Sequence, residues 1–142
     1  MRLLSRISML LIAVLLGFSS CDNEQPIGIW SPMKWNNVDN LTKTNNIYVI
    51  PAEGGSFTFE CKNYAPWLSD VIINTERQKM VLQENWNRKE YKNEWFEVKI
   101  IDKKVIFTFD KIEKPMTERT VEVEVTAGDI YDDFVFKQAA IS

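Results

Sequence analysis

Residues 120–126 read Thr-Val-Glu-Val-Glu-Val-Thr, a strict alternation of apolar β-branched residues with polar ones. Successive side chains of a β-strand point to opposite faces, so we expect the three valines to face a core and the two glutamates to face solvent. The segment therefore predicts a strand that is buried on one side, as in proteins built from two packed sheets.

Shorter runs with the same period of two lie on both sides of this strand, separated by Gly, Pro, Asn and Asp. They predict six more strands, at residues 46–50, 56–61, 67–74, 96–101 and 105–109 and in a final segment that carries Phe134 and Phe136 and ends at Gln138. Seven short strands in under about a hundred residues indicate an all-β fold, an immunoglobulin-like antiparallel β-sandwich over residues 46–142.

The core of this sandwich is expected to be aliphatic and rich in phenylalanine. Trp67, Phe107, Val123 and Phe136 are predicted to meet in it from opposing strands, with Trp95 also buried. Cys61 shares its face with two phenylalanines. A catalytic thiol needs a base or a positive environment, and the chain contains no histidine, so a buried and inert Cys61 is expected.

The chain begins with the layout of an export signal. Arg2 and Arg6 precede the uncharged run 9–18, which is shorter than the roughly 20 apolar residues of a membrane-spanning helix. Small residues then lead to Cys21, and this junction resembles the bacterial lipobox. Residues 1–20 are thus predicted to be a lipoprotein signal peptide and Cys21 the lipidated N-terminus. The alternative is an ordinary secretory signal that happens to end at a cysteine.

Residues 21–45 are rich in Asn, Thr and Pro and are predicted to be a tether. Their acidic start at 22–26 resembles that of lipoproteins displayed on the surface of some Gram-negative gut bacteria, so we expect a lipid-anchored protein of the outer membrane, exposed at the cell surface. The apolar patch 27–35 is expected to fold back on the domain rather than to form a ligand site.

Charge and composition exclude several classes of function. Without residues 1–20 the chain has 15 basic groups against 20 acidic ones, because Arg2 and Arg6 are the only charges removed from 17 and 20. A basic footprint for nucleic acid is therefore absent. The lack of histidine excludes Ser-His-Asp catalysis and the common zinc sites.

Carboxylate chemistry is the remaining route to an enzyme or a metal site. Hydrolysis of glycosides needs two carboxyl groups across a cleft, and the pairs Glu122/Glu124 and Asp132/Asp133 lie on faces expected to be solvated. Asp129, Asp132 and Asp133 form either a calcium site or, as we favour, a solvated turn. We expect no enzyme activity, no metal and no cofactor.

The order of several short motifs resembles a BACON domain. The motifs are a Gly54-Gly55 hairpin with its strand, Pro66-Trp67, Trp95-Phe96, a strand opened by Arg119, and a last strand closed by Gln138. The resemblance covers residues 47–140 and departs from the family at the long polar segment 75–93. It implies a β-sandwich found in exported proteins of gut bacteria that harvest glycans.

The segment 75–93 is predicted to contain a short strand near 80–82 or one helical turn, and to carry the functional site, since long insertions in compact domains are often functional. Trp86 is surrounded by polar residues and is expected to be exposed as a platform for a sugar ring. The neighbours expected to orient that sugar, or otherwise to line the site, are Asn85, Asn87, Arg88 and Tyr91. Trp86 could instead be a loop anchor.

Two functional hypotheses follow. The first is a non-catalytic surface lipoprotein whose sandwich binds a carbohydrate or mucin. The alternative is a structural spacer or protein-interaction module in a surface complex that captures glycans.

Overall fold

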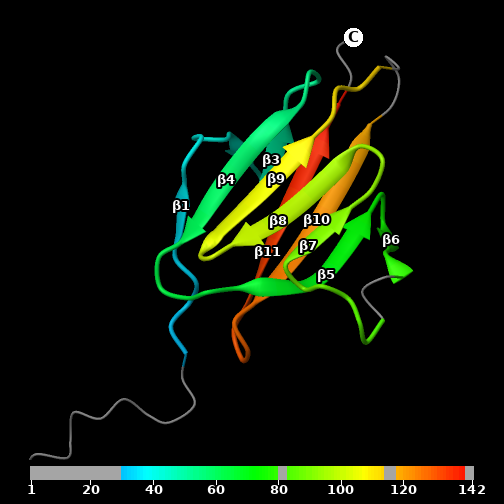
Figure 1. Cartoon of the computed structure of the whole chain (residues 1–142). Coiled ribbons are helices and arrows are strands. Elements are labelled where there is room, and N and C mark those ends of the chain that lie inside the picture. The colour runs from blue at the N-terminus through cyan, green and yellow to red at the C-terminus, as the bar shows by residue number, and fades with distance from the viewer. Residues whose placement is uncertain (1–29, 80–82, 114–117, 140–142) are drawn as a thin grey trace, which may run out of the picture. The chain divides into compact units, whose positions relative to one another are not determined.

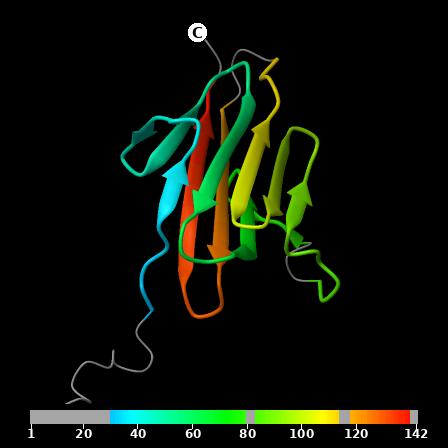
Figure 2. The ribbon, with the colours of Figure 1, turned by 60° about the vertical axis from the view of Figure 1, so that its left-hand side comes forward.

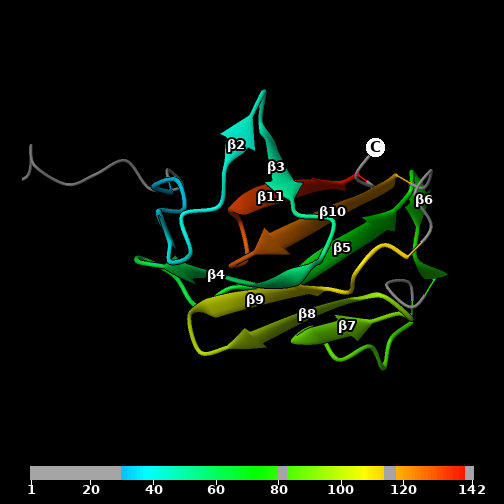
Figure 3. The ribbon, with the colours of Figure 1, turned by 90° about the horizontal axis from the view of Figure 1, so that it is seen from above.

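The computed structural model describes residues 30–79, 83–113 and 118–139, and the chain from Ser31 onward is one compact unit. Two sheets stack as layers in this unit (Figures 1 and 3). The five-stranded sheet has the order β1 (Trp35–Asn37), β4 (Gly55–Cys61), β9 (Lys104–Phe109), β8 (Phe96–Ile101) and β7 (Glu90–Lys92). The six-stranded sheet has the order β2 (Lys43–Thr44), β3 (Ile47–Ile50), β11 (Tyr131–Gln138), β10 (Arg119–Thr126), β5 (Trp67–Ile73) and β6 (Glu76–Arg77).

This architecture confirms the all-β, immunoglobulin-like sandwich. The seven strands expected from the sequence are β3, β4, β5, β8, β9, β10 and β11, and four shorter strands add to the sheet edges. One pairing differs from the expected antiparallel pattern, because β3 and β11 run parallel. The chain leaves β3 for the other sheet, as Figure 2 shows, so no hairpin forces these two neighbours to be antiparallel.

Two tight connections explain how the sequence fixes the sheet register. Asp102 has a φ of 55° in the two-residue turn between β8 and β9. Gly54 has a φ of 77° before β4, and a Cβ atom there would lie 2.1 Å from the carbonyl oxygen of Phe109. Only glycine fits this position.

Aromatic rings fill the space between the sheets. The ring centroids of Phe107 and Phe136 are 4.5 Å apart, and those of Phe59 and Phe134 are 4.9 Å apart. Phe107, Val123 and Phe136 have no exposed surface, which confirms their predicted place in the core, and Cys61 is buried as expected. Such aromatic pairs stabilise a core by about 0.5–1.5 kcal/mol each beyond the area they bury.

Trp67 is an exception among the predicted core residues. It is half-buried, and its neighbour Leu68 is the residue with no exposed surface. The cause is a bulge in β5, where Asp70 pairs with Glu124 but Leu68 pairs with Val125, leaving one residue unpaired. The extra residue reverses the inward and outward positions of the strand, so the prediction of a buried Trp67 is wrong.

Part of the range expected to be a tether takes up regular structure. Within 31–45, β1 pairs with β4 and β2 pairs with β3, so this stretch adds an edge strand to each sheet. The indole nitrogen of Trp35 also donates a hydrogen bond of 2.8 Å to Asp132. The predicted signal peptide and Cys21 lie outside the described residues. Within the described ranges no helix has the length and apolar character needed to cross a bilayer.

The polar segment 75–93 also contributes edge strands. Asn74 and Thr75, with φ of 48° and 72°, turn the chain into β6, and β7 pairs with β8 farther along. Residues 80–82, where a strand or helical turn was predicted, are outside the described ranges. The segment thus widens both sheets.

Candidate functional site

Trp95 lies in the connection from β7 to β8, and hydrogen bonds fix the backbone around it. The side-chain oxygen of Asn93 accepts bonds from the backbone nitrogens of Trp95 at 2.9 Å and Phe96 at 2.7 Å. The carbonyl oxygen of Trp95 accepts a 2.8 Å bond from the nitrogen of Asp110, which follows β9. These contacts hold the indole at one end of the five-stranded sheet, half-buried against the core.

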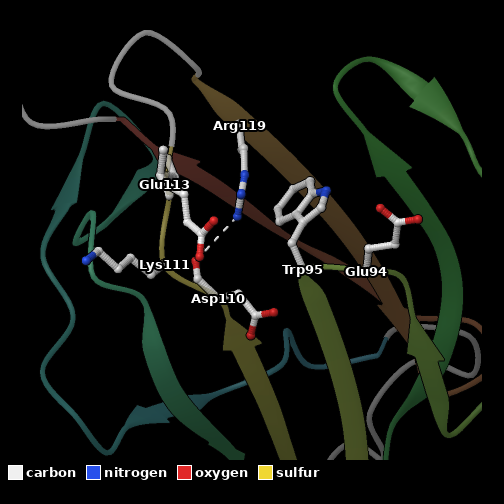
Figure 4. Close-up of a pocket in the computed structure, with 7 residues that line it drawn as sticks. Glu94, Trp95, Asp110, Lys111, Glu113 and Arg119 are labelled. Carbon is white, nitrogen blue, oxygen red and sulfur yellow. Dashed lines mark hydrogen bonds between the residues drawn. The ribbon is translucent and has the colours of Figure 1, made fainter.

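Arg119 covers part of the indole from the other sheet. Its guanidinium carbon lies 4.6 Å from the ring centroid of Trp95, and its Nη1 donates a 3.4 Å hydrogen bond to the carbonyl oxygen of Asp110. A cation over a tryptophan face is worth about 0.5–1 kcal/mol at exposed sites. Figure 4 shows the carboxylate of Glu94 on the opposite side of the indole from Arg119.

Gln138 supports the same region from inside the sandwich. It is fully buried, and its Nε2 donates to the carbonyl oxygens of Asp110 at 2.9 Å and Pro51 at 3.0 Å. Two side chains therefore hold the backbone of Asp110 in place, that of Arg119 from outside the sandwich and that of Gln138 from within it. The Trp95, Arg119 and Gln138 positions noted in the sequence motif meet at one end of the fold.

A cavity of about 600 Å³ opens at this place, and we call it the Trp95 cavity. It is lined by Glu94, Trp95, Asp110, Lys111, Ile112, Glu113 and Arg119 (Figure 4). Its volume is typical of small-molecule sites, at about 300–1,000 Å³, but its lining is far more polar than most of them. Three carboxylates and two cationic groups surround one indole and one aliphatic side chain.

Four of the five sequence-predicted site residues line a second cavity, the Trp86 cavity, of about 360 Å³. These are Asn85, Trp86, Asn87 and Tyr91. The side chain of Trp86 differs from the expectation of an exposed ring, since it is half-buried against the core and its Nε1 donates a 3.2 Å bond to the carbonyl oxygen of Glu90. The Trp86 ring therefore anchors its loop as well as lining the cavity.

The backbone of Arg88 and the side chain of Tyr91 make structural contacts. Arg88 does not line the Trp86 cavity, and its carbonyl oxygen accepts a 2.7 Å bond from the nitrogen of Leu68. The Tyr91 side chain is buried, and its hydroxyl contacts the side-chain oxygen of Gln78 at 3.1 Å. Burial raises the pKa of this hydroxyl above its ordinary value of 10.0.

The Trp95 cavity was missed by sequence reasoning because Trp95 was assigned to the core. Trp95 lies just before β8, at the end of the sheet, where its ring packs partly against the core and under the Arg119 guanidinium of the other sheet. Arg119 lies far from Trp95 in the sequence, and no local pattern shows that the two side chains stack. The described ranges contain no group of three metal-binding side chains that could hold an ion.

Comparison with known proteins gives one informative relative. No protein-family model and no curated protein matches the chain. Among solved structures, an NMR structure of a protein from Bacteroides thetaiotaomicron is 34% identical, covers 86% of this chain and 98% of its own, and superposes with a TM-score of 0.68. The M1 domain of titin is 13% identical, covers 78% of this chain and 95% of its own, and has a TM-score of 0.46.

The sheet topology shows an immunoglobulin-like sandwich, and a fold alone defines neither a role nor a ligand. The sequence identity and the coverage of the first relative are high enough to show that the two proteins are related. The chain belongs to the same protein family as this Bacteroides thetaiotaomicron protein.

Proposed function

We propose that this protein is a non-catalytic module that binds carbohydrate at the Trp95 cavity. The observation that carries the proposal is a half-buried indole set among carboxylates, a guanidinium and an ammonium group in a cavity of about 600 Å³. The part of the indole that Arg119 leaves uncovered supplies an apolar surface for the C–H groups of a sugar ring. Charged groups around it supply acceptors and donors for the hydroxyls.

The composition of the cavity favours a sugar over other small ligands. An apolar ligand would find only Trp95 and Ile112 to pack against, and its contact would desolvate charged groups without compensation. A strongly anionic ligand would meet the carboxylates of Glu94, Asp110 and Glu113. A neutral polyhydroxylated ligand can donate to these carboxylates and accept from Arg119 and Lys111, so it fits both sets of groups.

We further propose that the module is exported and held on a membrane by a lipid on Cys21. The basic start, the short apolar run and the small residues before this cysteine support the proposal. Acyl chains contribute about 0.8 kcal/mol per buried methylene, so a multiply acylated cysteine holds a protein on a bilayer. The likeness of the motif order to BACON domains supports an outer-membrane lipoprotein of this glycan-associated kind, exposed to glycans or mucin at the cell surface.

A second candidate function is a spacer or protein-interaction module in a surface complex. The observation in its favour is on the other sheet, where Val49 and Tyr131 are 48% and 56% exposed on the solvent side. The two side chains lie apart on this face, because Val49 pairs with Lys137 and Tyr131 pairs with Thr126, so each is a separate apolar contact point for a protein partner. This candidate requires no sugar affinity, which makes the two functions separable by experiment.

A printed array of neutral and acidic glycans, probed with residues 22–142, tests the carbohydrate proposal. This fragment contains the whole compact unit. A double variant, Glu94→Ala with Asp110→Ala, removes two exposed carboxylates from the cavity, and Glu60→Ala with Asp129→Ala removes two carboxylates elsewhere.

We expect the unmodified protein to bind neutral glycans, the first double variant to lose most of that signal and the second to keep it. If the two double variants bind glycans equally well, the sugar binds outside the Trp95 cavity. An array without signal would leave the protein-interaction function as the better candidate.

A further inference from the structure

A row of side chains on the outer face of the five-stranded sheet joins the two tryptophan cavities. Lys92 of β7 pairs with Glu97 of β8, and Glu97 pairs with Thr108 of β9. Cross-strand partners share a face of the sheet, and this face is the outer one because the neighbours Phe96 and Val98 are buried. The row therefore faces solvent beside both cavities.

The cavities share lining residues along this row. A third cavity of about 290 Å³ is lined by Lys92, Glu97 and Thr108, and also by Glu94, Trp95 and Asp110 of the Trp95 cavity. Lys92 and Glu97 line the Trp86 cavity as well. Trp86, the row of three side chains and Trp95 are thus successive parts of one surface trough, which we call the two-tryptophan trough.

The trough is longer than one sugar ring. At one end of the trough, the indole nitrogen of Trp86 donates a hydrogen bond to the carbonyl oxygen of Glu90. At the other end, the side-chain oxygen of Asn93 accepts a hydrogen bond from the backbone nitrogen of Trp95. The extended segment from Glu90 to Asn93 spans about 10 Å at roughly 3.4 Å per residue, and residues on both sides of this segment in the chain line the two cavities. A ligand that contacts both indoles must be a chain.

Charge along the trough indicates which chain fits. Five carboxylates and four cationic groups line the three cavities. Lys92 and Lys99 lie 3.8 and 3.7 Å from the carboxylate oxygens of Glu97, so the cations at the centre are already paired. A polyanionic chain would need unpaired cations in a row, whereas hydroxyl groups can bond to paired ions of either sign.

We propose that the two-tryptophan trough binds a neutral oligosaccharide chain, with a sugar packed at each tryptophan and the linking sugars over the Lys92–Glu97–Thr108 row. The inference rests on the proposed carbohydrate function and adds to it the length and charge class of the ligand. Binding should strengthen with chain length until both ends of the trough are occupied.

Length series of neutral glucans, xylans, mannans and galactans, from one to six sugars, test the trough, with heparin as the polyanionic comparison. Affinities for residues 22–142 are measured by calorimetry. The central variant is Glu97→Thr and its matched control is Glu60→Thr, because both are outer-face strand carboxylates near a lysine and Glu60 lines none of the three cavities.

At least one series should bind about tenfold more tightly as a hexamer than as a dimer. Glu97→Thr should abolish most of this gain, while Glu60→Thr changes neither the gain nor the affinity for the shortest bound sugar. At the far end, Trp86→Ala should reduce hexamer binding. Asn85→Ala should also reduce hexamer binding. It replaces an exposed side chain of the Trp86 cavity and leaves the packed indole in place.

The outcomes separate the two proposals. The trough proposal is overturned if sugars bind at Trp95 with an affinity that does not depend on chain length. It is also overturned if Glu97→Thr leaves the gain with length intact. Either result leaves the carbohydrate function standing. Heparin bound more tightly than every neutral series overturns the proposed charge class. No binding by any sugar overturns the carbohydrate function and the trough together.

Discussion

The bulge in β5 yields a sharp prediction about two adjacent residues, Trp67 and Leu68. Leu68 has no exposed surface and lies in the core, whereas Trp67 is half-buried on the outer face, opposite Thr126. Threonine is a good strand former, so replacing each residue by threonine holds the backbone preference constant. The two substitutions then differ in the burial and the size of the side chain removed, and the smaller one is the buried one.

Leu68→Thr should lower the free energy of unfolding by at least about 3 kcal/mol. Truncating a buried leucine typically costs about 2–5 kcal/mol, and an unpartnered buried hydroxyl adds roughly 1–3 kcal/mol. Trp67→Thr should cost only about 1 kcal/mol, a value typical of point substitutions. Because domains of this kind have a total stability of about 5–15 kcal/mol, urea unfolding monitored by circular dichroism resolves the difference. A larger loss for Trp67→Thr than for Leu68→Thr would refute the bulge and place Trp67 inside.

Three other predictions concern the core, the acidic sheet face and the lipid anchor. Gln138→Met keeps the volume but removes the bonds to Pro51 and Asp110, so urea unfolding should show a loss of about 1–3 kcal/mol, and an unchanged midpoint would contradict these bonds. The Asp133 pKa is raised by burial and then by Glu124, its cross-strand partner, so the ionised carboxylate destabilises the fold as pH rises through that pKa. Asp133→Asn should therefore raise the melting temperature at pH 7, and this gain should vanish in acid below the unfolded-state value of about 3.9, whereas a pH-independent gain would point to another cause. Cys21→Ser should release the protein from the membrane fraction of its host, and unchanged retention would exclude the lipid anchor at this residue.

The sequence was sufficient to predict the strands because one buried sheet face imposes a period of two. The alternation at 120–126 and at 105–109 survives in β10 and β9, and Val123, Phe107 and Phe136 lie where that period places them. Edge strands such as β1 and β7 were not predicted. They have three residues each, which is too short to display a period, and their positions depend on pairing with distant strands.

The site was less predictable, for two physical reasons. A bulge adds one residue without a marker in the sequence, so Trp67 and Leu68 exchanged their expected environments. Polar neighbours suggested an exposed Trp86, but a flat ring with one polar nitrogen can pack against a core and still donate to a carbonyl oxygen. The stacking of Arg119 on Trp95 is a contact between the two sheets, which only the tertiary structure reveals.

The most direct test of carbohydrate binding at the Trp95 cavity is an NMR titration of residues 22–142 that follows the indole N–H and arginine side-chain signals. The titrant is the neutral hexasaccharide of each series, glucan, xylan, mannan and galactan. The signals of Trp95 and Arg119 should shift in a saturable way with at least one of them, while Tyr131→Ala, on the other sheet, leaves the titration unchanged. Saturable shifts confined to residues of the six-stranded sheet other than Arg119, or no shift with any hexasaccharide, would contradict the proposed site.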